Sequence, residues 1–180
     1  MTTQGTGAHK RSGIMTGMFT DKESTESAYQ SLRDRGYSDD EINVIMSDET
    51  RNKYYANDTD SALGNKAAEG TGIGGAIGGT LGAIIGGIAA IGTNLVLPGL
   101  GLVVWGPIAA ALAGAGAGGL TGGLVGALVG WGIPEDRAAA YETGIKNGGT
   151  VLGVTPRSDE DATALENEWK TNYRGQDIYR

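Results

Sequence analysis

The sequence predicts an α+β fold in which one small domain is interrupted by a long apolar insert. Two observations lead to this prediction. First, the 65 residues from Gly70 to Pro134 contain no Asp, Glu, Lys, Arg or His, and 22 of the 33 glycines of the 180-residue chain lie among them. Second, the charged segments on both sides contain short apolar runs typical of strands next to amphipathic patterns typical of helices. The elements of the domain therefore come from two separate parts of the chain.

The N-terminal flank, residues 14–50, predicts a strand, a helix and a second strand. Residues 14–20 (IMTGMFT) form a short apolar run with strand propensity. Residues 22–35 place apolar side chains at helical spacing among charged ones, and Gly36 gives a stop signal. Residues 42–47 (INVIMS) have the length and composition of a buried strand.

The C-terminal flank, residues 134–180, predicts a helix, a strand, a second helix and a short final strand. Pro134 suits the first position of a helix, and acidic residues follow in its first turn. Residues 150–154 (TVLGV) are typical of a strand, and Ser158 is placed to cap the second helix. Residues 176–179 (QDIY) predict a short edge strand.

The size of the flanks indicates how they are organised. Neither carries enough apolar residues to fold alone without disulfides, so we expect the two halves to share one sheet. The order βαβ, insert, αβα(β) is that of the ferredoxin-like α+β plan, with the insert in place of the connection after the second strand. The predicted boundaries are a disordered leader over 1–13, the first half of the domain over 14–50, a linker over 51–69, a glycine-zipper helical hairpin over 70–133 and the second half over 134–180.

Glycines recur every four residues in both arms of the insert, a small-xxx-small pattern that lets helices approach closely. Because glycine costs an exposed helix about 1 kcal/mol relative to alanine, a bilayer or a protein partner must surround these helices. Each arm of ~25 residues is long enough to cross a bilayer, and residues 94–107 supply the turn. The candidate residues for helix packing and oligomerisation are Gly74, Gly78, Gly82, Gly86, Gly114, Gly118, Gly122, Gly126 and Gly130.

Two tryptophans flank the second arm, Trp105 near the turn and Trp131 near the exit, where residues that anchor a helix at the membrane interface are expected. The apolar residues of the first arm favour insertion by only about 3 to 6 kcal/mol, so pairing between arms or between chains must add stability. Insertion into a membrane is the favoured interpretation. The alternatives are a soluble assembly with the hairpins at its core, a membrane-permeabilising protein, and an aggregation-prone or disordered segment.

The composition argues against enzymatic chemistry. The chain has no Cys, and its single histidine, His9, lies in the polar leader, so no catalytic residue, metal site or cofactor is expected. The net charge of −7 argues against a nucleic-acid partner. The match to GxGxxG at residues 114–119 lacks the strand that a dinucleotide site places before it. No small-molecule substrate is evident.

Two longer stretches carry a resemblance to a known family. They are TGMFTDKESTESAYQSLRDRGYSDDEINVIMSDE (residues 16–49) and, after the glycine-rich insert, GIPEDRAAAYETGIKNGGTVLGVTP (residues 132–156). Together they resemble bacterial general stress proteins of the heat-induced YflT-like family. The resemblance implies a stress-response role that is non-enzymatic and membrane-associated, and it assigns no catalytic residue.

The sequence as a whole predicts a protein that associates with a membrane and with copies of itself through the glycine-zipper helices. We expect it at the cytoplasmic membrane with both termini in the cytoplasm, because no secretory signal is visible. The alternative is a soluble cytoplasmic assembly. A large particle that persists without detergent would favour that alternative.

Overall fold

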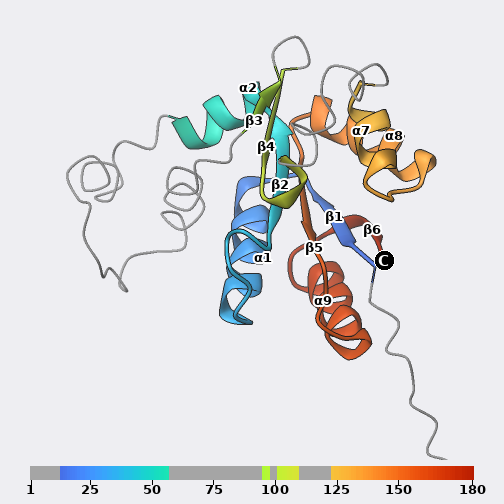
Figure 1. Cartoon of the computed structure of the whole chain (residues 1–180). Coiled ribbons are helices and arrows are strands. Elements are labelled where there is room, and N and C mark those ends of the chain that lie inside the picture. Colours follow the sequence, from blue (N-terminus) through green and yellow to red (C-terminus); the bar gives the residue numbers. More distant parts are fainter. Residues whose placement is uncertain (1–12, 57–94, 98–100, 110–122) are drawn as a thin grey trace, which may run out of the picture.

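The structure is a computed structural model that describes residues 13–56, 95–97, 101–109 and 123–180 (Figure 1). It is an α+β fold built on a six-stranded sheet in the order β3-β4-β2-β5-β1-β6, and every pair of neighbouring strands is antiparallel. The predicted leader, apart from Gly13, and most of the predicted linker lie outside the described residues.

The N-terminal flank contains the strand, helix and strand that its sequence predicts. The Asp21 carboxylate accepts a hydrogen bond from the backbone N–H of Ser24 (2.8 Å) and so starts the helix. Gly36, at φ +85°, follows the helix in the left-handed region, which favours glycine. The elements are β1 (Met15–Phe19), α1 (Lys22–Asp34), β2 (Asn43–Ser47), the short helix α2 (Asp48–Arg51) and the π-helical turn η1 (Asn52–Ala56).

The rest of the described chain adds four strands and three helices. Pro134 is the N-cap residue of one helix, one position before the first helical position that the sequence predicts for it. As predicted, the Ser158 hydroxyl caps another helix by accepting from the N–H of Asp161 (3.1 Å). The elements are β3 (Leu95–Leu97), β4 (Leu102–Trp105), α7 (Gly123–Gly130), α8 (Glu135–Lys146), β5 (Thr150–Val154), α9 (Asp159–Thr171) and β6 (Gln176–Tyr179).

Strand β5 of the C-terminal flank lies between β1 and β2 of the N-terminal flank. It is antiparallel to both: Val151 is opposite Met18 of β1 on one side and opposite Ile45 of β2 on the other. Strands β1 and β2 are therefore parallel to each other and separated by a strand from the other end of the sequence. The two flanks form one sheet, as the small size of each led us to expect.

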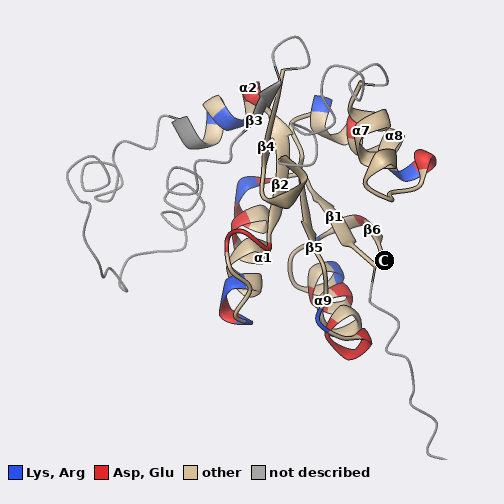
Figure 2. Ribbon diagram, viewed as in Figure 1, with Lys and Arg blue, Asp and Glu red and all other residues tan. Residues whose placement is uncertain are grey.

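Helices cover both faces of this sheet, so strands β1, β2, β4 and β5 are buried on both sides. Helices α1 and α9 pack on one face, where Trp169 meets Phe19 edge to face with ring centroids 5.3 Å apart. Helices α7 and α8 pack on the other, through Leu128, Tyr141 and Ile145. The charged side chains are concentrated on α1, α2, α8 and α9, as Figure 2 shows.

The sequence predicts that residues 94–107 form a turn between two helices, but the described part of this range forms two strands of the sheet. Strands β3 and β4 pair with each other, and β4 pairs with β2, where Trp105 is opposite Val44. The β-branched and aromatic residues of this segment favour an extended backbone, and Gly101 (φ +60°) takes the left-handed conformation next to the reversal. The middle of the predicted insert is thus part of the domain.

The structure describes only the end of the second arm of the predicted hairpin. This part is α7, a helix of 8 residues that begins at Gly123 (φ +63°) and packs through Leu124, Ala127 and Leu128. Its packing against the domain differs from the predicted membrane hairpin, and residues 110–122 lie outside the described residues. The first arm lies outside the described residues.

Candidate functional site

The structure places only some of the predicted site residues. Gly74, Gly78, Gly82, Gly86, Gly114, Gly118 and Gly122 lie outside the described residues. Gly126 and Gly130 lie on α7, where an added β-carbon would meet no described atom within 4 Å. No close backbone approach at these two glycines is therefore seen within the described ranges.

The two tryptophans have different surroundings. Trp105 is 5 % exposed in the core between the sheet and the α1/α9 layer, so it does not lie at a surface as an interfacial anchor would. The cause is its position in β4, which turns its side chain towards that layer. Trp131 is partly buried and packs over Gly153, with its Cη2 atom 3.5 Å from the position of an added β-carbon.

A cleft lies at the end of the sheet where β2 meets α2, and we call it the sheet-end cleft. It consists of two cavities of about 200 and 280 Å³ that share Ser47 and Lys146. One cavity is polar, and the other contains the apolar side chains of Leu102, Leu124 and Ile145. The polar cavity includes Ser47, Glu49, Thr50, Lys53, Lys146 and Asn147.

Local structure fixes the polar half of this cleft. The Ser47 hydroxyl caps α2 by accepting from the N–H of Thr50 (3.0 Å), and its oxygen lies 2.8 Å from the Thr50 hydroxyl. Lys146 pairs with Glu142 one turn earlier on α8 (2.8 Å). Lys53 lies over the Tyr54 ring, 4.9 Å from its centroid, and makes no ion pair with any described residue.

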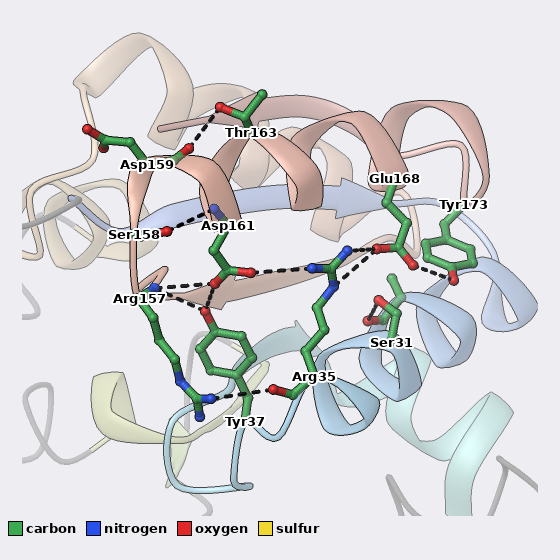
Figure 3. Close-up of polar contacts among 11 residues, drawn as sticks. Ser31, Arg35, Tyr37, Arg157, Ser158, Asp159, Asp161, Thr163, Glu168 and Tyr173 are labelled. Carbon is green, nitrogen blue, oxygen red and sulfur yellow. Dashed lines mark hydrogen bonds and ion pairs between the residues drawn. The ribbon is translucent and has the colours of Figure 1, made fainter.

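A second polar cluster joins the C-terminal end of α1 to α9 (Figure 3). Arg35 donates to Glu168 (2.6 Å) and to Asp161 (3.3 Å), and the Tyr37 hydroxyl donates to Asp161. The Arg157 guanidinium stacks 4.4 Å from the centroid of the Tyr37 ring. It also donates a hydrogen bond to the backbone carbonyl of Gly36, just after α1 (2.7 Å). We call Arg35, Tyr37, Arg157, Asp161 and Glu168 the interhelix cluster.

The electrostatics of the interhelix cluster indicate a structural role. Its hydrogen bond to Glu168 raises the pKa of Arg35, and burial together with the bond to Asp161 raises the pKa of Tyr37 to about 12. Both shifts move titration away from neutral pH, whereas a general acid or base works best with a pKa near it. The hydrogen bonds of the cluster instead join Arg35 and Tyr37 of the N-terminal flank to Asp161 and Glu168 of the C-terminal flank.

The raised tyrosine pKa values predict a loss of stability at alkaline pH. Tyr37 keeps its proton in the folded state up to about pH 12, whereas an unfolded tyrosine loses it near pH ~10. The stabilising contribution is thus complete below pH ~10 and declines as the pH rises towards 12. The free energy of unfolding from urea titrations at pH 8, 10 and 11 should fall as the pH rises. In Tyr37→Phe the slope of this free energy against pH should be less steep, by an amount that corresponds to at most about one proton. An equally steep fall in that variant would contradict the assignment.

Sequence reasoning missed both sites for the same reason. Arg35 and Glu168, like Ser47 and Lys146, are far apart in the chain, and only the strand order brings each pair together. Within the described ranges, no group of His, Cys, Asp and Glu side chains is arranged to hold a metal ion. Among the helices that the structure describes, none has both the length and the apolar character needed to cross a membrane.

Comparison with known proteins finds no match to this chain among protein-family models, curated proteins or solved structures. The evidence for function therefore comes from the chain itself. It consists of an α+β domain rich in charged residues, the sheet-end cleft, the interhelix cluster, and the uncharged sequence from Gly70 to Pro134 that interrupts the domain.

Proposed function

We propose that this protein is a non-enzymatic stress-response protein that associates with a membrane and with copies of itself through the uncharged segments of its chain. The observation that carries the proposal is the contrast between the charged α+β domain and residues 70–94, which have no ionisable side chain and contain the four-residue glycine repeat. A folded soluble domain rarely leaves so long an apolar segment without a partner. The resemblance to bacterial general stress proteins supports the same role, and we place the domain and both termini on the cytoplasmic side.

The fold supports a specific form of this association. Residues 57–94 begin after η1 and end before β3, so both ends belong to the same domain. Since one crossing takes about 20 residues, a segment that crosses the bilayer and returns needs about 40, more than the uncharged part of this stretch supplies. Residues 110–122 are too short for one crossing. We therefore propose that residues 70–94 enter the membrane from one side and leave it on that side, in place of a hairpin with two full spans.

We also propose that the domain is of the ferredoxin-like type. Strands β1 and β2 are parallel with β5 between them, which is the split βαβ arrangement of that plan, and α9 with β6 supplies its last two elements. Strands β3 and β4 and helices α7 and α8 are then additions, inserted where the plan has a short connection. Of these additions, helices α7 and α8 cover the sheet face that α1 and α9 leave open, and strands β3 and β4 extend the sheet.

Self-assembly without lipid is a second candidate function, and the surface of α7 favours it. Val129 is 42 % exposed, and Gly126, three residues earlier, lies beside it on the helix. A second chain is one way to cover this apolar face. Leucine substitutions at Gly78 and Gly82 should weaken oligomers if the glycine repeat packs helices together. Ala89→Leu is the matched control, because Ala89 continues the four-residue spacing of the large apolar residues Ile77, Leu81 and Ile85.

Fractionation of a lysate separates the two functions. The membrane proposal predicts that the protein sediments with membranes, stays there through an alkaline carbonate wash and is released by detergent. A large particle in the soluble fraction that persists without detergent would overturn it in favour of lipid-free assembly.

A further inference from the structure

We propose that the sheet-end cleft binds a zwitterionic phospholipid of the phosphoethanolamine type, with its phosphate next to Lys53 and Lys146, its amino group next to Glu49, and its acyl chain along Leu102, Leu124 and Ile145. The inference rests on the proposed membrane association, since it names the lipid that the folded domain recognises there.

The first argument is the two-part character of the cleft. Its polar cavity carries hydroxyl, amide and charged groups from α2, η1 and the end of α8. Its other cavity combines three aliphatic side chains from β4, α7 and α8 with the Glu142 carboxylate. The cavities share Ser47 and Lys146 in their linings and are therefore adjacent. Their combined volume reaches the lower part of the range of about 300–1,000 Å³ that is usual for small-molecule sites. A ligand with a polar head and an apolar tail matches this division.

The second argument is the balance of charge. Lys53 and Lys146 provide two positive groups, and Glu49 and Glu142 provide two negative ones. Glu142 already neutralises part of Lys146 at 2.8 Å, whereas Lys53 lies over the Tyr54 ring and forms no ion pair with a described residue. A purely anionic head group would meet Glu49 as a like charge. A head group that carries both a phosphate and an ammonium pairs with both signs.

The third argument is the place of the cleft in the fold. Its polar half includes Lys53 and Tyr54 of η1, the last described element before residues 57–94. The proposed membrane segment, residues 70–94, starts 14 residues after η1 ends. The cleft therefore lies at the part of the domain from which the chain leads towards that segment.

The test is a titration of the full chain with monoacyl phosphoethanolamine below its micelle concentration, followed through the backbone amide shifts of Ser47, Thr50 and Gly148. We expect saturable shifts at these three residues. Phosphoethanolamine without an acyl chain, a neutral detergent of the same chain length, and the matching monoacyl phosphoglycerol should each bind more weakly, by at least about threefold. Equal binding of the neutral detergent or of the phosphoglycerol lipid would overturn the proposed head-group recognition, and absent shifts would overturn the site.

Charge variants give a second measurement. Lys53→Gln and Glu49→Gln should each weaken binding by at least about threefold. The first removes a positive charge beside the phosphate, and the second removes the negative charge beside the amino group. Lys170→Gln is the matched control: Lys170 is an exposed lysine that pairs with Glu166 one turn away on α9, as Lys146 does with Glu142 on α8. Unchanged affinity in both cleft variants would contradict the proposal.

Failure of the cleft and failure of membrane association give different results. If only the cleft proposal is wrong, the full chain floats with vesicles of phosphatidylethanolamine and phosphatidylglycerol while the amides of the cleft do not shift. If only the membrane proposal is wrong, the monoacyl lipid shifts those amides but the chain stays with the soluble fraction.

Discussion

Trp169→Ala should lower the free energy of unfolding by about 3–5 kcal/mol, a large part of the ~5–15 kcal/mol of a typical domain. The Trp169 side chain is fully buried and packs edge to face on Phe19 of β1. It also lies against Gly17, where an added β-carbon would be only 2.8 Å from its Cε3 atom. The truncation leaves a cavity between α9 and the sheet that neighbouring residues fill only in part.

Urea unfolding followed by circular dichroism measures this effect. Trp131→Ala is the control because it makes the same chemical change at a partly buried site, and we expect a smaller loss there. Because α9 of one flank packs on β1 of the other, the helical circular dichroism and the tryptophan fluorescence should change together in a single unfolding transition. Two separate transitions, or a loss no larger than that of the control, would contradict the shared core.

Gly106→Ala should cost about 3 kcal/mol or more, because it combines backbone strain with a clash. Gly106 has φ +89°, and an added β-carbon would lie 2.3 Å from the carbonyl oxygen of Ile42 and 3.0 Å from the Cα of Asn43. Both neighbours are backbone atoms and cannot rotate away. A shift here also disturbs the buried bond from the N–H of Ile108 to Asn43 Oδ1 (2.8 Å).

Gly101→Ala separates the two contributions. Gly101 also has a positive φ, +60°, but an added β-carbon meets no described atom within 4 Å. We expect a loss of only about 1 kcal/mol there, the cost of the left-handed backbone. Equal losses at the two glycines in urea titrations would show that the contact with Ile42 is not as close as the structure places it.

Local patterns in the sequence were sufficient for the elements of both flanks. Strand β1, helix α1 and strand β5 fall within a residue or two of their predicted limits, because caps at Asp21 and Ser158 and the apolar runs of the strands act over only a few residues. These signals need no knowledge of the rest of the chain.

The interpretation of the insert was less successful, for a physical reason. Strand β4 is stabilised by pairing with β2, which lies more than fifty residues earlier, and its apolar sequence is equally compatible with a membrane segment. Trp105 was placed at a membrane interface on the same grounds and is instead buried beside the sheet. Tertiary pairing of this kind leaves no local periodic signal.

The candidate sites show the same limit. Lys146 lies at the end of α8, but its neighbours in the sheet-end cleft, Ser47 and Lys53, come from the N-terminal flank and from the predicted linker. Arg35 and Asp161 form an ion pair in the structure although they lie in different flanks of the chain. The strand order, with β5 between β1 and β2, is what brings each set together.

Flotation of the purified protein with phospholipid vesicles tests the central claim most directly. In the comparison chain, residues 70–92 are replaced by a Gly/Ser linker of the same length, which leaves β3 and every other described element unchanged. The account predicts that the natural chain floats with the vesicles and the comparison chain stays at the bottom, while both unfold at the same urea concentration. Flotation of both chains, or of neither, would contradict the proposal that the uncharged segment is what binds the membrane.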